Sequence, residues 1–144
     1  MPKNFNIHQI GKMDTLINNQ YVLPDSKKTI FGKMFLNEFM NLSGCEISFN
    51  AFGPGQFIPF NHNHIANEET FIFLSGFGEC EIDGEKVKVK EGSVINMQPN
   101  AVRNVCNTSK DTILNFIVIQ TKKNSMNSVQ LTKDGIGVSD RPYW

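Results

Sequence analysis

The feature that most constrains the fold is a succession of short apolar or alternating segments, each closed by a turn signal. These segments span residues 45–52, 69–75, 79–82, 86–90, 94–97, 102–106 and 112–120. Asp83-Gly84 is a two-residue hairpin signal, and residues 86–90 then alternate lysine with valine. Turns about every 8–12 residues in an all-β pattern predict a sandwich or a small barrel. The double-sheet jelly roll fits this pattern.

Two histidines one residue apart, His62 and His64, lie between the first two of these segments. Side chains at positions i and i+2 of a strand point to the same face. A tight reversal through residues 65–67 would bring a carboxylate, Glu68 or Glu69, alongside them in the next antiparallel strand. Two imidazoles and one carboxylate on one face form a ligand set for a divalent transition metal.

The stretch from residue 53 to residue 76 resembles the first motif of the cupin superfamily. That motif has a glycine, a short segment, His-x-His, a few residues, a glutamate and, after six more residues, a glycine. Six residues separate Glu69 from Gly76, so the spacing selects Glu69 rather than Glu68 as the ligand-type carboxylate. The resemblance implies a cupin-type double-stranded β-helix, the jelly-roll barrel of small single-domain Cupin_2-like proteins. It also implies a metal site on His62, His64 and Glu69.

A second stretch, residues 92–107, resembles the second cupin motif, with Gly92, Pro99 and Asn107 at matching places. The place of the last metal histidine holds Arg103. Arginine stays protonated and offers no lone pair, so it cannot be a metal ligand. Three roles for Arg103 remain open. It pairs with Glu69 in a metal-free barrel, it binds an anionic substrate beside the metal, or it turns to the surface.

The length of 144 residues fits a single cupin domain over 1–144. The barrel core is expected over about 45–120, with an N-terminal arm over 1–44 and a C-terminal tail over 121–144. Residues 29–42, rich in phenylalanine and methionine, predict a short helix or an irregular pair of strands. Because this segment would otherwise be an exposed apolar patch, we expect a homodimer. Tyr143 and Trp144 are expected to dock the tail on the barrel.

Charge and cysteine content indicate which partners and which cellular compartment to expect for this protein. The 14 basic and 14 acidic residues form no basic stripe, which argues against a nucleic-acid partner. No apolar run approaches about 18 residues, and the N-terminal residues resemble no secretory signal. Three cysteines in separate segments favour a reducing compartment and small apolar core side chains. We therefore expect a cytoplasmic protein without a membrane partner.

The function predicted from these features is small-molecule binding at a divalent-metal site. The metal would be Fe, Mn, Zn or Ni, held by His62, His64 and Glu69, with Arg103 binding the substrate. A metal-dependent enzyme acting on a small anionic substrate, a carboxylate or a sugar derivative, fits this site. The alternative is a metal-free, non-catalytic ligand-binding or sensing cupin in which Arg103 pairs with Glu69. The sequence does not decide whether the protein is an enzyme.

Overall fold

The structure is a computed structural model that describes residues 4–126, 135, 137–139 and 141–142. Nearly all of its regular structure is extended. The strands are β1 (Gln20–Val22), β2 (Thr29–Phe31), β3 (Lys33–Phe35), β4 (Glu46–Phe52), β5 (Asn67–Ser75), β6 (Phe77–Ile82), β7 (Glu85–Lys90), β8 (Val94–Met97), β9 (Arg103–Asn107) and β10 (Leu114–Lys122). Two short 3-10 helices, η1 (Met13–Asn18) and η2 (Leu36–Glu38), flank the first strands.

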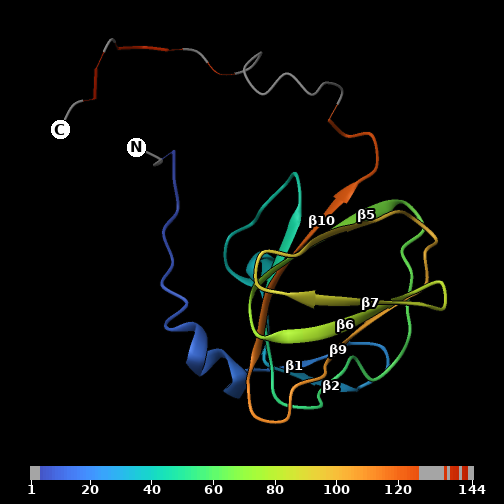
Figure 1. Ribbon diagram of the computed structural model, residues 1–144. Helices are drawn as coiled ribbons and strands as arrows, with labels where there is room; N and C mark the ends of the chain where they lie inside the picture. The colour runs from blue at the N-terminus through green and yellow to red at the C-terminus, as the bar shows by residue number, and fades with distance from the viewer. Residues whose placement is uncertain (1–3, 127–134, 136, 140, 143–144) are drawn as a thin grey trace.

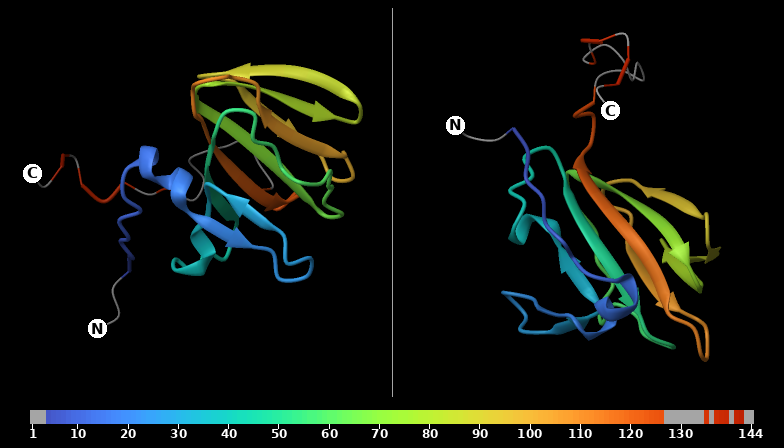
Figure 2. Two further views of the ribbon diagram at one scale, coloured as in Figure 1. Left: turned by 90° about the horizontal axis from the view of Figure 1, so that it is seen from below. Right: turned by 90° about the vertical axis from the view of Figure 1, so that its left-hand side faces the viewer.

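The barrel consists of two antiparallel sheets that face each other (Figures 1 and 2). The larger sheet has the order β3-β4-β10-β5-β8, and the smaller has the order β7-β6-β9. One apolar core fills the barrel, formed by Ile30, Phe52, Ile58, Phe71, Phe73, Cys80, Val89, Met97, Val105, Leu114, Phe116 and Val118. The predicted all-β class is confirmed, and β4 to β10 correspond to the seven segments of the sequence pattern.

The predicted hairpin joins β6 to β7. Both turn residues have positive φ, 51° at Asp83 and 88° at Gly84. This combination is what a two-residue type I′ turn requires, and glycine adopts it without steric cost. The turn fixes the register in which Ile82 faces Glu85. β6 also pairs with β9 along its other edge, where Arg103 lies opposite Ile82.

The N-terminal arm contributes three short strands, one of which joins the larger sheet of the barrel. Residues 29–42 do not form one helix, because the chain changes direction at Gly32 between two short strands. β2 pairs with β1 in a separate two-stranded sheet, whereas β3 adds to the edge of β4. Gly32 has φ 69°, and a Cβ at this position would lie 1.9 Å from the carbonyl oxygen of Ala51. The approach of these two backbones therefore requires glycine.

Substituting Gly32 with alanine should destabilise the protein by about 2–4 kcal/mol, through positive-φ strain plus a backbone clash. Chemical denaturation measures this loss. Gly55→Ala is a matched control, since Gly55 has φ 72° but open space around its Cβ position. The control should cost only about 1–2 kcal/mol. Equal losses in the two variants would show that the contact with Ala51 carries no energy.

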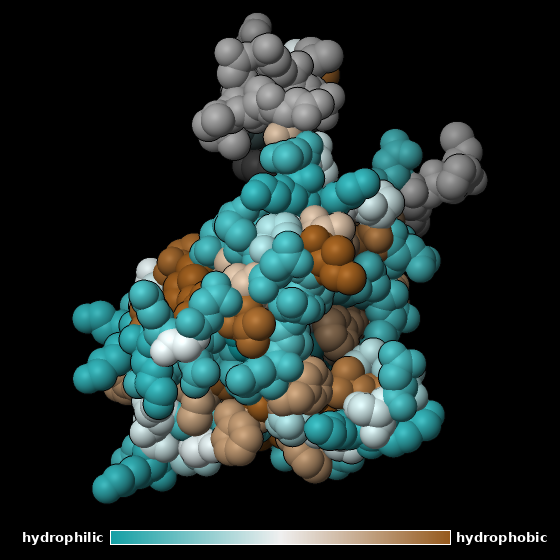
Figure 3. All heavy atoms as spheres, turned by 90° about the vertical axis from the view of Figure 1, so that its right-hand side faces the viewer, coloured by the Kyte–Doolittle hydropathy of each residue, from teal (hydrophilic) through white to brown (hydrophobic). Residues whose placement is uncertain are grey.

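The apolar segment 29–42 is only partly used inside the barrel. Phe35 lines the internal cavity, and Phe39 stacks on His8 with ring centroids 4.0 Å apart. Phe31 remains 49% exposed. On the face shown in Figure 3, hydrophobic side chains form separate groups among polar ones. The homodimer remains a prediction. The predicted docking of Tyr143 and Trp144 falls outside the described residues.

Two further features of the described residues are the environment of the Cys80 thiol and the length of the helices. Cys80 is completely buried, and burial raises the pKa of its thiol to about 12. A thiol with so high a pKa is a small apolar core side chain rather than a nucleophile. No helix in the described part of the chain is long and apolar enough to span a membrane.

Candidate metal centre and ligand cavity

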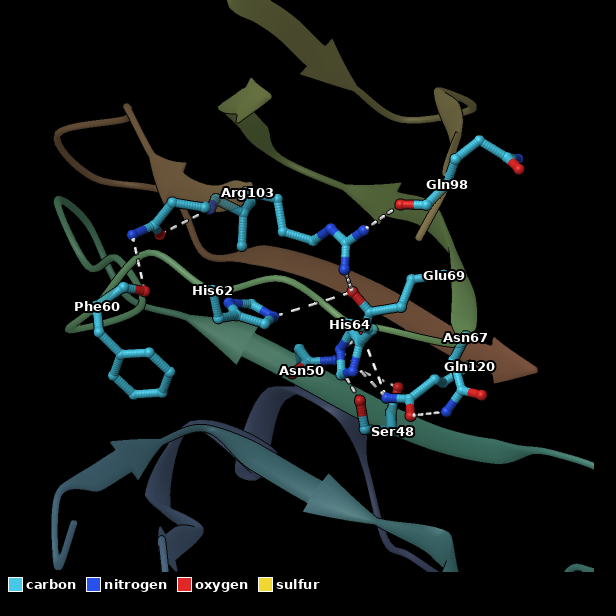
Figure 4. A network of polar contacts seen from close by, with 12 residues as sticks. Ser48, Asn50, Phe60, His62, His64, Asn67, Glu69, Gln98, Arg103 and Gln120 are labelled. Atoms are coloured by element: carbon cyan, nitrogen blue, oxygen red, sulfur yellow. Dashed lines mark hydrogen bonds and ion pairs between the residues drawn. The ribbon is translucent and has the colours of Figure 1, made fainter. Parts of the chain in front are cut away.

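Three predicted residues, His62, His64 and Glu69, come together inside the barrel (Figure 4). His64 Nε2 lies 3.1 Å from Glu69 Oε1, and His62 Nε2 lies 3.9 Å from Glu69 Oε2. One potential ligand atom from each residue lies within 4.8 Å of the others. The spacing argument that selected Glu69 over Glu68 therefore agrees with the geometry.

The local backbone differs from the regular strand pair that the sequence suggested. His62 and His64 lie in an irregular segment before β5, and His62 makes one isolated bridge to Arg103 of β9. In this bridge the His62 N–H donates to the Arg103 carbonyl at 3.2 Å, and the Arg103 N–H donates back at 2.8 Å. The histidines thus reach Glu69 from the opposite sheet, because β5 and β9 belong to different layers.

The environment keeps His62 neutral. Burial lowers the pKa of His62 to about 4, with contributions from the positive charges of His64 and Arg103, although Glu69 opposes this shift. A neutral imidazole retains the lone pair that a metal requires. Nδ1 of His62 is buried without a hydrogen-bond partner among the described residues.

Glu69 is held as a carboxylate despite its burial, at 5% exposure. Burial by itself would raise the pKa of Glu69. The hydrogen bond from His64 and the charges of His64, Arg103 and His62 outweigh this effect and lower the pKa. The 3.1 Å contact between His64 and Glu69 places a proton on His64 Nε2. Metal binding by this nitrogen would therefore displace a proton.

Arg103 is one of the most buried side chains, at 1% exposure, which excludes the surface role. Its Nη1 lies 3.3 Å from Glu69 Oε2, and its Nη2 donates to the Gln98 carbonyl at 2.7 Å. Nε has no hydrogen-bond partner among the described residues. The guanidinium supports Glu69 from behind and does not line the cavity.

The three residues of the metal-type cluster, His62, His64 and Glu69, line a cavity of about 170 Å³. The remaining lining is mostly apolar and comprises Leu23, Ile30, Phe35, Ile58, Phe60, Phe71, Phe116 and Val118. Polar lining comes from Lys33, Glu46, Ser48 and Gln120 besides the cluster itself. A mostly apolar cavity with a few convergent polar groups is typical of a small-molecule site.

Two cavity residues, Gln120 and Lys33, were not found from the sequence. Gln120 Nε2 lies 3.4 Å from both His64 Nε2 and Glu69 Oε1. The two-residue periodicity of β10, which places Gln120 on the same face as Phe116 and Val118, could have indicated it. Lys33 is the single basic residue within the apolar run 29–36. The backbone changes direction at Gly32, just before Lys33, and no local sequence pattern indicates this change.

The donor set fits a divalent transition metal. His62 offers a neutral imidazole, His64 a second imidazole and Glu69 an ionised carboxylate, with one potential ligand atom of each within 4.8 Å of the others. Two histidines and one carboxylate are a known ligand combination for such ions, and they leave coordination positions open. Arg103 shares Glu69 with this cluster, so its positive charge counts against metal affinity.

Comparisons with known proteins agree with this architecture. A curated relative, an uncharacterized protein of Aquifex aeolicus (strain VF5), is 37% identical over 79 residues, which cover 55% of this chain and 60% of that protein. A crystal structure of a cupin protein from Bacteroides fragilis has a TM-score of 0.76 at 26% identity, covering 95% of this chain and all of that one. A predicted oxalate decarboxylase from Thermotoga maritima has a TM-score of 0.61 at 19% identity, covering 79% of this chain and 99% of that chain.

The sequence profile of the cupin domain, Cupin_2, matches residues 49–120. This match includes both segments on which the sequence resemblance depends, and it covers half of the chain. The strand order and the cluster inside the barrel are in accord with it. The chain belongs to the Cupin_2 family of cupin domains.

Proposed function

We propose that this cupin binds a divalent transition metal through His62, His64 and Glu69 and acts as an enzyme on a small anionic molecule in the adjoining cavity. The observation that carries this proposal is that three potential ligand atoms lie within 4.8 Å of one another in the lining of a mostly apolar cavity. When bound by these three residues, a divalent ion would supply Lewis-acid chemistry toward a substrate oxygen.

The surrounding residues have separate tasks in this proposal. Arg103 fixes the orientation of Glu69 through the 3.3 Å contact to Oε2. Gln120 lies beside His64, and its amide Nε2 donates to Glu69 Oε1 at 3.4 Å, which helps to hold the carboxylate in place. The apolar lining keeps water away from the polar end, which strengthens electrostatic interactions there.

The structural neighbours share the fold of this chain, but they do not identify its reaction. The Thermotoga maritima neighbour carries the name of an enzyme that acts on a small carboxylate. Its likeness to this chain is one of fold, and one cupin fold supports many reactions. The proposal of a small anionic substrate therefore depends on the charges around this cavity.

A second function is favoured by a specific contact. The ion pair between Arg103 and Glu69 would neutralise the carboxylate without a metal. In that case the protein is a metal-free binding or sensing barrel, and the histidines act as hydrogen-bonding groups toward the ligand.

Metal analysis separates these functions. We expect the purified protein to bind Zn²⁺, Ni²⁺, Mn²⁺ or Fe²⁺ with one site per chain in calorimetric titrations, supported by elemental analysis. His62→Ala and His64→Ala should each weaken binding by at least about tenfold, since each removes one ligand. His8→Ala is the matched control, because His8 lies outside the cluster and should leave binding unchanged. Failure of the wild-type protein to bind any of these ions would favour the metal-free function.

A further inference from the structure

Lys33 approaches the same cavity from β3, outside the segment matched by the family. Its ammonium donates to Ser48 Oγ at 3.0 Å and to Asn50 Oδ1 at 2.9 Å. A lysine ammonium has three N–H donors. Two neutral acceptors therefore leave one donor and the whole positive charge for another partner.

The charge of Lys33 has no direct counter-ion within the protein. Among residues 4–126, no carboxylate lies within ion-pair distance of this ammonium. Glu69 and Glu46 act on it only through space, and burial lowers the pKa of Lys33 to about 8 despite them. At neutral pH the side chain is still mainly charged. A charge in a mostly apolar cavity is costly unless an opposite charge joins it.

The position of Lys33 is fixed by its surroundings. Asn50 is completely buried, and its amide nitrogen lies 3.2 Å from Ser48 Oγ, so both acceptors of Lys33 are held in place. The side chain of Asn19 donates to the backbone carbonyl of Lys33. The ammonium also lies over the ring of Phe35, 4.7 Å from its centroid. Such a rigid donor is suited to binding rather than to solvation at a surface.

Arg103, predicted to bind the substrate, lies on the other side of the cluster. Figure 4 shows Arg103 and Gln98 on one side of Glu69, with Ser48 and Asn50 on the other. Ser48 lines the cavity and Arg103 does not. The guanidinium of Arg103 forms an ion pair with Glu69 and donates a hydrogen bond to the Gln98 carbonyl. Of these two cations, Lys33 is the one that a ligand in the cavity can reach.

We propose that Lys33 binds the carboxylate of a small monocarboxylic acid whose hydrocarbon part packs against the apolar lining of the cavity. The cavity volume of about 170 Å³ is close to that of a cavity that accepts benzene. Phe60, Phe71 and Ile58 provide apolar contacts for such a body. This inference deepens the proposed function by naming its substrate class, but it needs only the cavity and Lys33, not the metal.

Binding of benzoate and of pentanoate, each compared with its neutral amide, tests the inference in the full-length protein. Calorimetry or ligand-observed NMR should show that the wild type prefers at least one acid over its amide by tenfold or more, since hydrogen bonds to charged groups exceed neutral ones. Lys33→Met should abolish this preference. Lys88→Met, which removes an exposed lysine of β7, is the matched control and should retain it.

Two further measurements make the outcome decisive. Metal titration of Lys33→Met should show binding at least as tight as in the wild type, because Lys33 is no metal ligand and its positive charge acts through space on Glu69 and His62. The proposed metal site can therefore fail while the preference for the acid persists. Circular dichroism shows whether Lys33→Met is folded. If Lys33→Met does not fold, Lys33→Arg takes its place and should keep part of the preference for the acid, because it retains the positive charge. Equal affinity of wild type for acids and amides, or a preference that survives Lys33→Met, would overturn the inference.

Discussion

Replacing Arg103 with alanine should lower the free energy of unfolding by about 3–5 kcal/mol, since a buried carboxylate would lose its ionic partner. Glu69 is 5% exposed and Arg103 only 1%. The substitution also frees the Gln98 carbonyl and leaves a cavity. Arg103→Met keeps most of the volume, so its loss of stability reports mainly the missing charge. Urea denaturation of the two variants gives both values.

The matched control is an exposed ion pair on the smaller sheet. Lys86 Nζ lies 3.5 Å from Glu79 Oε1, with 65% of the lysine side chain exposed. Lys86→Met should cost less than about 1 kcal/mol, because solvent screens the pair. If Arg103→Met costs no more than Lys86→Met, the contact between Arg103 and Glu69 contributes little to folding.

Metal should compensate for the loss of Arg103 if the cluster binds an ion. A ligand present at a hundred times its dissociation constant stabilises the folded state by about 2.7 kcal/mol. Adding Zn²⁺ or Ni²⁺ to Arg103→Ala should therefore raise the melting temperature more than in the wild type. Equal shifts would mean that Arg103 does not oppose metal binding.

Replacing Arg103 with histidine should tighten metal binding by about 10–100-fold. The guanidinium adds a permanent positive charge beside Glu69, and at about 6 Å a divalent ion is repelled by several kcal/mol for an effective dielectric near 20. Loss of the contact that positions Glu69 offsets part of this gain in the variant. Histidine removes this charge and supplies an imidazole at the place of the last cupin metal histidine. Calorimetric titration of wild type and Arg103→His with the same ion measures the gain.

Arg103→Gln separates the two contributions. Glutamine removes the charge but adds no imidazole, so its affinity should lie between those of the wild type and Arg103→His. If histidine and glutamine give the same affinity, the gain is electrostatic and no fourth ligand forms. A weaker site in both variants would show that Arg103 positions Glu69 for the metal and that this positioning outweighs the repulsion.

Local patterns predicted much of the barrel. The Asp83-Gly84 turn predicted the β6–β7 hairpin because positive φ at two consecutive residues depends on the residues themselves. Alternation predicted β4 and β7, because side chains on a strand point to opposite faces whatever the neighbouring strands are. Short apolar segments bounded by turn residues predicted the other strands from β5 to β10. The spacing of His62, His64 and Glu69 predicted the cluster because all three lie within eight residues of chain.

The N-terminal arm could not be predicted in the same way. Residues 29–42 form two short strands in different sheets because the backbone at Gly32 approaches Ala51, a residue far along the chain. Lys33 lines the cavity for the same reason. Its acceptors Ser48 and Asn50 belong to β4, and pairing of β3 with β4 brings them together.

The sequence by itself determined the jelly-roll class, the cupin family and the residues of the candidate metal centre, because these depend on local spacing and strand periodicity. Only the tertiary structure showed where the side chain of Arg103 lies, buried against Glu69 and not at the surface. Its bridge to His62 and its pairing with Glu69 join the two sheets, and such contacts form when both layers pack on one core. The same packing leaves the charge of Lys33, rather than that of Arg103, facing the cavity.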